Sequence, residues 1–176
     1  MVKRVTVDEY FRMPESNRPM ELVYGYVREP PAPFYSHQSV VGTMFEVLRR
    51  HTRRYDLGIV GISPLDVVLD KDSDLVVQPD VLFVAKARLD IVRDRVWGPP
   101  DLAVEVLSRG TARRDRSLKV GWYHRYGVTE CWIVDMKRAS VEVIELQTDQ
   151  RNVFEERQRI RSAVLPRLAT RVDRFF

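Results

Sequence analysis

The spacing of apolar residues changes along the chain, and each spacing predicts one kind of element. In residues 35–58 apolar side chains recur every three or four positions, which predicts an amphipathic helix with Ser36 as its N-cap and Gly58 at its end. Thr6, with Glu9 three positions later, has the pattern of a capping box and predicts a short helix. The predicted helices cover residues 6–14, 35–58 and 111–128.

Apolar runs rich in Val, Ile, Leu and Tyr predict strands between and after these helices. Strands that are interspersed with helices favour an α/β fold in which a mixed sheet is flanked by helices. A chain of 176 residues is long enough for one hydrophobic core, so we expect residues 1–176 to form a single domain. The predicted strands cover residues 20–30, 62–70, 75–85, 101–108, 130–136 and 140–146.

The strand predicted at residues 101–108 carries a carboxylate in its middle. Successive side chains of a strand point to opposite faces, so Glu105 shares its face with the apolar residues Ala103 and Leu107. A carboxylate on a buried face is costly unless a cation compensates it. The alternative is a solvent-facing glutamate on a half-exposed strand, which the apolar neighbours disfavour. We therefore expect a compensating cation opposite Glu105.

Asp80 is a second candidate for the same place. It follows Pro79 and begins the apolar run of residues 81–84. If its strand lies beside the Glu105 strand, both carboxylates reach one point, where hard cations such as Mg²⁺ or Mn²⁺ accept oxygen ligands. Taken alone, Asp80 fits equally well as a turn or strand-start residue after a proline.

Lys119 is a candidate cation on the helix that follows the Glu105 strand. Asp115, Lys119 and Tyr123 are spaced by four residues and so lie on one helical face. A helix that packs back over the sheet could bring Lys119 to the Glu105 side. The alternative is an exposed pair between Asp115 and Lys119, and the residues alone favour that pair.

Composition and charge indicate the cellular compartment of the protein, and they say little about its chemistry. Lys and Arg number 29 against 25 Asp and Glu, and the formal net charge of +4 permits contact with nucleic acid without requiring it. The basic run at residues 49–54 is interpreted as the solvated end of a helix.

The single cysteine, Cys131, excludes an internal disulfide and favours a reducing cytoplasm. Because no apolar run is typical of a signal peptide or a membrane span, we expect a cytoplasmic protein.

An ordered series of segments resembles the Uma-type family of restriction endonucleases, within the PD-(D/E)xK nuclease superfamily. The resemblance extends over about residues 5–170, and its specificity comes from the order and spacing of the segments. It implies a restriction-endonuclease-like core, in which a mixed sheet flanked by helices carries a metal site. The segments are "MELVYGYV", "SHQSVVGTM", "VQPDVLFV", "PPDLAVEVLS", "RRDRSLKVGWYHRYGV" and "ECWIVDMKRASVEVIEL".

The resemblance assigns catalytic roles to three of the residues already considered. Asp80 matches the aspartate of the PD element, and Glu105 matches the acidic residue of the (D/E)xK element. The chain departs from the superfamily pattern at Leu107, which stands where the lysine is expected. Lys119, on the following helix, matches the place from which this family supplies the lysine. It would orient a water, help to deprotonate it, or stabilise the transition state.

The resemblance also implies a metal site with supporting residues. Mg²⁺ or Mn²⁺ would be held by Asp80, Glu105 and the backbone carbonyl of Val106. Glu21 resembles an acidic residue that supports the metal site, and His37 matches a histidine common at that point of the family. The alternatives for these two are a carboxylate on a strand face and a polar residue at a helix N-terminus.

The function implied is a metal-dependent DNA endonuclease that hydrolyses phosphodiester bonds. The sequence does not distinguish DNA from RNA as its substrate. The alternative is a domain of the same fold that binds nucleic acid, or acts as a scaffold, without catalysis. Arginines just after the Glu105 strand could contact DNA phosphates, or could form a solvated helix start. These arginines are Arg109, Arg113, Arg114 and Arg116.

Cleavage of both strands of a duplex is simplest with two active sites, so we expect a homodimer. The candidate contacts are the strand at residues 140–146, taken as an edge strand, and the apolar terminus at residues 172–176.

Overall fold

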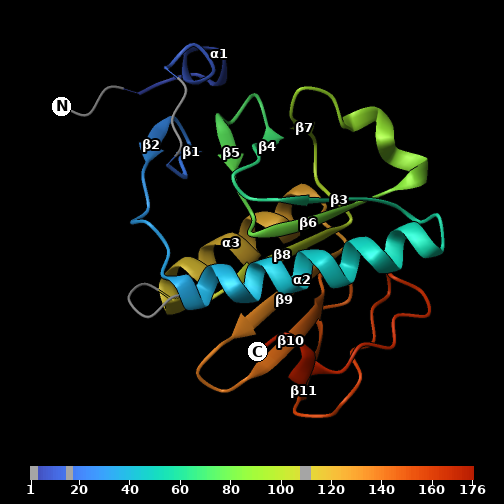
Figure 1. Ribbon diagram of the computed structural model, residues 1–176. Coiled ribbons are helices and arrows are strands. Elements are labelled where there is room, and N and C mark those ends of the chain that lie inside the picture. Colours follow the sequence, from blue (N-terminus) through green and yellow to red (C-terminus); the bar gives the residue numbers. More distant parts are fainter. Residues whose placement is uncertain (1–3, 15–17, 108–111) are drawn as a thin grey trace.

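The computed structural model describes residues 4–14, 18–107 and 112–176, and only the backbone of residues 112–116 (Figure 1). Its fold is a mixed α/β arrangement, as the sequence predicted, but with two mixed sheets where one was expected. The helical elements are α1 (Val7–Tyr10), α2 (Tyr35–Arg54), η1 (Lys86–Ile91), α3 (Ala112–Tyr126) and η2 (Val172–Arg174).

The larger sheet has six strands in the order β11-β10-β9-β8-β6-β3. Neighbouring strands are antiparallel except for β8 and β9, which are parallel and are connected through α3. Its strands are β3 (Gly58–Ile62), β6 (Val81–Ala85), β8 (Leu102–Val106), β9 (Glu130–Asp135), β10 (Ser140–Glu145) and β11 (Gln150–Glu155).

The smaller sheet has five strands in the order β2-β1-β5-β4-β7 and packs against α1 through its own apolar cluster. Only the β4–β7 pair is parallel. Its strands are β1 (Glu21–Val23), β2 (Tyr26–Arg28), β4 (Val67–Asp70), β5 (Leu75–Val77) and β7 (Val96–Trp97).

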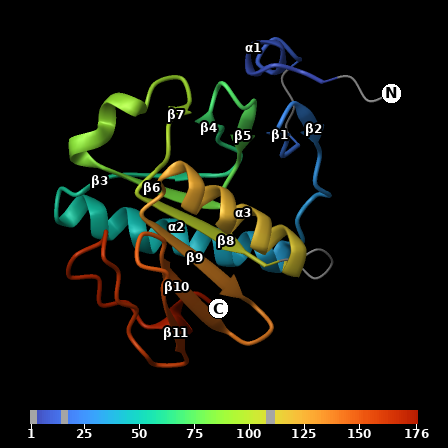
Figure 2. The same ribbon diagram turned by 180° about the vertical axis from the view of Figure 1, so that it is seen from behind.

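Helices α2 and α3 cover opposite faces of the six-stranded sheet (Figures 1 and 2). Val104 and Trp132 face the α2 side, where they share a core cluster with Met44. Ala103 and Cys131 belong to the other cluster, together with residues of α3. Cys131 is therefore a buried small apolar residue, as the sequence indicated.

Two predicted strands are each divided in the structure. Residues 20–30 form the β1–β2 hairpin because Tyr24 and Gly25 turn the chain with φ of 51° and 85°. Residues 75–85 are split between β5 in one sheet and β6 in the other. Pro79, which has no N–H to donate, lies at the break.

The ends of α2 differ from the prediction. Its N-cap is Phe34 rather than Ser36, and no side chain caps it. The helix ends at Arg54, and Gly58 instead begins β3. With φ of +147°, Gly58 lies so close to β6 that an added Cβ would be 2.1 Å from the Val84 carbonyl oxygen. The predicted capping box of Thr6 and Glu9 at α1 is confirmed.

The edge-strand prediction behind one dimer contact is wrong, and two of the three apolar residues at the other contact are buried. The strand at residues 140–146 is not an edge, because β11 pairs with β10 along its whole length. Val172 and Phe175 of the terminus are buried in the core beside α2, because the tail folds back over the sheet. The homodimer itself stays a prediction.

Among the residues that the structure describes, every helix is too short or too polar to cross a lipid bilayer.

Candidate active site

Five of the predicted site residues come together from both sheets and both long helices. Glu21 begins β1, Asp80 directly precedes β6, and Glu105 lies in β8. His37 is in the first turn of α2, and Lys119 is in α3. Figure 1 shows that the starts of α2 and α3 and the hairpin of β1 and β2 lie on the same side of the molecule.

The cation opposite Glu105 is the ammonium of Lys119. Its Nζ lies 3.2 Å from Oε1 and 3.1 Å from Oε2 of Glu105. The same Nζ lies 2.8 Å from Oε1 of Glu21. All three side chains are largely buried, with exposed fractions of 16% for Lys119, 12% for Glu105 and 11% for Glu21. Lys119 therefore bridges two buried carboxylates. The side chain of Asp115, its partner in the alternative prediction, lies outside the described residues.

Tyr123 completes the surroundings of Glu105 and was not predicted as a site residue. Its hydroxyl donates a 2.5 Å hydrogen bond to Oε1 of Glu105. Lys119 and Tyr123 are one helical turn apart, so a single face of α3 supplies both donors. That spacing was visible in the sequence and was the signal that could have identified Tyr123.

Asp80 and His37 hold the end of β8 from the other side. Oδ2 of Asp80 accepts a 2.7 Å hydrogen bond from the backbone N–H of Val106. Nε2 of His37 lies 3.1 Å from the Val106 carbonyl oxygen and 3.4 Å from Oδ2 of Asp80. Nε2 donates in this arrangement, because a carbonyl oxygen only accepts. The two residues thus fix both backbone groups of Val106.

Gln78 connects the smaller sheet to the site and was also missed. Its backbone N–H donates to Oε1 of Glu21 at 3.0 Å. Its side-chain amide donates to Asp66 at 2.8 Å and accepts from the Met20 backbone at 3.3 Å. These contacts join residues that are distant in the sequence, and no local sequence pattern predicts them.

Burial dominates the electrostatics of Glu105. Desolvation raises the pKa of its carboxyl from 4.5 to about 7, although the charge of Lys119 opposes the rise. The negative charges of Asp80 and Glu21 raise the pKa further, and the Tyr123 hydrogen bond lowers it. Acidic groups with such raised pKa values are concentrated at functional sites.

The neighbouring carboxylates favour the protonated forms of Lys119 and His37. Burial alone would lower the pKa of Lys119, but the charges of Glu105 and Glu21 outweigh it and raise the pKa above its ordinary value. Burial also acts to lower the pKa of His37, and the hydrogen bond and charge of Asp80 raise it. Lys119 is therefore a charged donor here, and these surroundings oppose its use as a base.

The oxygen atoms of the site suit a hard divalent cation. Asp80 and Glu105 offer carboxylates beside the backbone of Val106, and the charge of Asp80 is close enough to raise the pKa of Glu105. Within the described parts of the chain, no three His, Cys, Asp or Glu side chains are arranged as metal ligands. Carboxylate and carbonyl oxygens are the donors that Mg²⁺ accepts, and water and substrate oxygens would complete its shell. A cation would also offset the mutual repulsion of the carboxylates, so the residues present fit one.

The predicted arginine contacts to DNA cannot be placed. Arg109 lies outside the described residues. Arg113, Arg114 and Arg116 lie in α3, where the structure describes only their backbone. Their side chains lie outside the described part of the structure.

Comparisons with known proteins bear on both the fold and the family. The family profile described as "Uma2: Putative restriction endonuclease" matches residues 7–173. A crystal structure from Anabaena variabilis, described as "a putative nuclease belonging to DUF820", superimposes with a TM-score of 0.82 at 18% sequence identity. The superposition covers 98% of this chain and 97% of that chain, which establishes a shared fold. The search of curated proteins gave no match.

The family match includes every residue of the site, from Glu21 on β1 to Tyr123 on α3. It extends over nearly the whole chain, and the chain accordingly belongs to the Uma2 family.

Proposed function

We propose that the protein is a metal-dependent DNA endonuclease whose active site contains Asp80, Glu105 and Lys119. The observation that carries the proposal is the buried cluster in which Lys119 lies between Glu105 and Glu21, with Asp80 just before the neighbouring strand β6. Family membership supports the nuclease class. Two buried carboxylates next to a positively charged side chain suit the hydrolysis of a phosphodiester.

Asp80, Glu105 and the carbonyl of Val106 would hold the divalent cation. When bound, Mg²⁺ or Mn²⁺ lowers the pKa of a water molecule and stabilises negative charge on the phosphate that is cut. Glu105 must be ionised to act as a ligand. Because its pKa without metal is about 7, the cation also favours the ionised form.

The remaining residues orient the oxygen donors and add positive charge. Tyr123 holds one oxygen of Glu105 by a 2.5 Å hydrogen bond. His37 and Asp80 fix the peptide of Val106. Lys119 remains protonated, so it acts by donating hydrogen bonds and by stabilising charge that develops on the phosphate. Glu21 keeps the Lys119 ammonium in place.

The test is cleavage of plasmid and oligonucleotide substrates with Mg²⁺, Mn²⁺ or EDTA, using wild type and Glu105→Ala. Glu46→Ala, an exposed glutamate on α2, is the matched control. We expect cleavage that requires metal, is abolished by Glu105→Ala and survives Glu46→Ala. Cleavage that survives Glu105→Ala would contradict the site. A folded protein that binds DNA with every metal but never cuts it would favour the non-catalytic binding domain.

The same assay separates DNA from RNA. Matched DNA and RNA oligonucleotides are incubated with the preferred metal under single-turnover conditions. We expect cleavage of the DNA strand, and faster cleavage of the RNA strand would contradict the proposed substrate.

A further inference from the structure

Two segments far apart in the sequence place exposed arginines together at the C-terminal end of α2. Arg50 and Arg54 are one helical turn apart on α2, and the others belong to the chain after β11. We call this group the arginine surface. Its members are Arg50, Arg54, Arg159, Arg161 and Arg167, and all five are exposed.

Specific contacts hold the two segments side by side. Nε2 of His51 lies 3.0 Å from the carbonyl oxygen of Pro166. The guanidinium groups of Arg54 and Arg167 each lie 5.6 Å from the centre of the Tyr55 ring, so both flank one aromatic side chain. The tail is therefore packed on the last turns of α2, and the arginines of the two segments form one surface.

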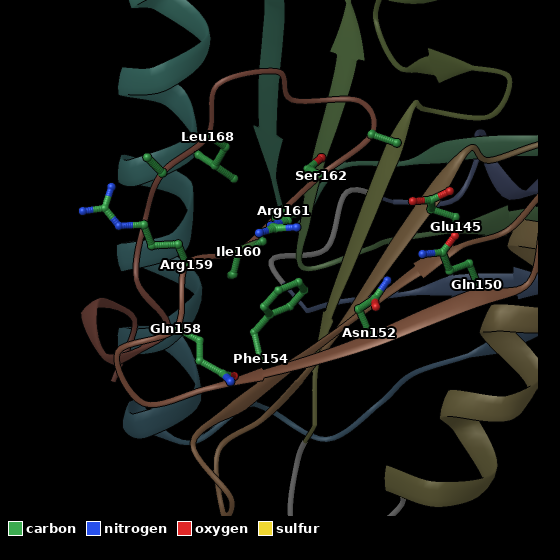
Figure 3. Close-up of a pocket in the computed structure, with 12 residues that line it drawn as sticks. Glu145, Gln150, Asn152, Phe154, Gln158, Arg159, Ile160, Arg161, Ser162 and Leu168 are labelled. Carbon is green, nitrogen blue, oxygen red and sulfur yellow. The ribbon is translucent and has the colours of Figure 1, made fainter.

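Arg159 and Arg161 continue this surface along the tail. Ile160 between them is fully buried and donates its backbone N–H to Thr170 at 3.0 Å. Because neighbouring side chains of an extended segment point in opposite directions, the two arginines project away from the core. In Figure 3 the side chain of Arg159 points away from Phe154 and toward the side on which α2 lies.

Arg159 and Arg161 line a hollow of about 730 Å³ between β11 and the tail. The amide side chains of Gln150, Asn152 and Gln158 also line it and offer N–H donors (Figure 3). Glu145 contributes a carboxylate at its far side. The hollow thus adds hydrogen-bond donors beside the exposed cations.

The arginine surface carries positive charge that the described residues leave without a paired carboxylate. In the described part of the chain, none of the five guanidinium groups forms an ion pair with a carboxylate. Of the exposed carboxylates in the same segments, Asp56 pairs with Lys86 and Asp173 pairs with Arg171, and the others are Glu46, Glu155 and Glu156. The five guanidinium groups therefore give this surface a local positive charge.

We propose that the arginine surface binds the phosphate backbone of the nucleic acid on which the active site acts. This inference takes its ligand class from the proposed function. The surface is separate from the site, since Arg50 and Arg54 lie roughly 20–25 Å along α2 from His37 at 1.5 Å per residue. Guanidinium groups bind phosphates bidentately and give affinity that does not depend on sequence.

The test compares two variants that lose the same charge. In the surface variant Arg50, Arg54 and Arg167 are changed to Gln. In the control, Arg12, Arg93 and Arg138, which are exposed elsewhere, are changed to Gln. Binding of a labelled duplex is measured by fluorescence anisotropy in EDTA over a series of salt concentrations, so that no cleavage occurs. Thermal melting checks that each variant is folded.

We expect the surface variant to bind at least ~10-fold more weakly than wild type at low salt, and the slope of log K against log salt to fall by roughly three. The control variant should keep most of the affinity and the slope. Changing the same three arginines to Lys should restore binding, because the point charges remain. Equal losses in surface and control variants would overturn the proposal.

Other outcomes separate this inference from the proposed catalytic function. If duplex binding depends on the surface but no metal supports cleavage, the arginine surface stands and the endonuclease does not. If cleavage occurs and the surface variant binds and cuts like wild type, the endonuclease stands and the surface proposal is wrong. Binding to vesicles of anionic lipid with no binding to nucleic acid would also overturn it.

Discussion

The substitution Glu105→Gln tests the site without relying on activity. It keeps the shape of the side chain and removes the charge that burial disfavours. In the unfolded chain the carboxyl ionises near its ordinary pKa of 4.5, whereas in the fold its pKa is about 7. Below pH 4.5 both states are protonated and Glu105 has no electrostatic cost. As the pH rises from 4.5 to about 7, the folded protein keeps a proton that the unfolded chain has lost. The free energy of unfolding therefore falls over this pH range.

The size of the effect follows from the two pKa values. One pKa unit corresponds to about 1.4 kcal/mol, so ionised Glu105 lowers the free energy of unfolding by about 3 kcal/mol above pH 7. Glu105→Gln should therefore become more stable relative to wild type by about that amount between pH 5 and pH 8. For a chain of this length, this is a relative gain of roughly 6–12 °C in Tm.

The assay is urea unfolding of both proteins at pH 5 and pH 8 in EDTA, repeated at pH 8 with Mg²⁺. Glu46→Gln serves as the exposed control. The change in ΔΔG between the two pH values is the deciding quantity, because any loss of hydrogen bonding in the amide is present at both. We also expect Mg²⁺ to stabilise wild type and not the variant. A ΔΔG that does not change with pH would contradict the claim that burial raises the pKa of Glu105.

Three further substitutions test other contacts by urea unfolding, and the first two also by cleavage. Lys119→Met leaves Glu21 and Glu105 buried without their cation. We expect the free energy of unfolding to fall by roughly 3–5 kcal/mol at pH 8 and by less at pH 5, and equal losses at the two pH values would contradict this. Tyr123→Phe removes the hydrogen bond to Glu105 and should cost about 1–3 kcal/mol and slow cleavage, whereas the exposed Tyr26→Phe should change neither. Glu130→Ala removes the carboxylate that accepts hydrogen bonds from Ser162 and Ala163 of the tail. We expect the free energy of unfolding to fall by about 3 kcal/mol or more, and a smaller fall than that caused by Glu46→Ala would contradict this.

The sequence predicted the elements whose signals are local. The capping box at Thr6 and Glu9, the apolar spacing of α2 and the apolar run of β8 are each patterns within a short stretch of sequence. It failed where a long-range contact decides the structure. Residues 150–155 alternate without a strong apolar pattern and form β11 only because β10 offers an edge.

The candidate site shows the same limit. Ala103 and Leu107 indicated that Glu105 faces an apolar region and needs a cation. The residues alone nevertheless favoured an exposed pair for Lys119, and only the family resemblance put Lys119 at the site. Gln78 lay beyond sequence reasoning because its contact with Glu21 depends on the long-range pairing of β1 with β5.

In the proposed site, Asp80 and Glu105 together hold a catalytic divalent cation. Isothermal titration of Mn²⁺ into wild type, Asp80→Asn and Glu105→Gln at pH 8 tests this without interference from a contaminating nuclease. We expect one site in the wild type, and an affinity at least ~10-fold weaker in either variant. Equal Mn²⁺ affinity in all three proteins, each shown to be folded, would contradict it.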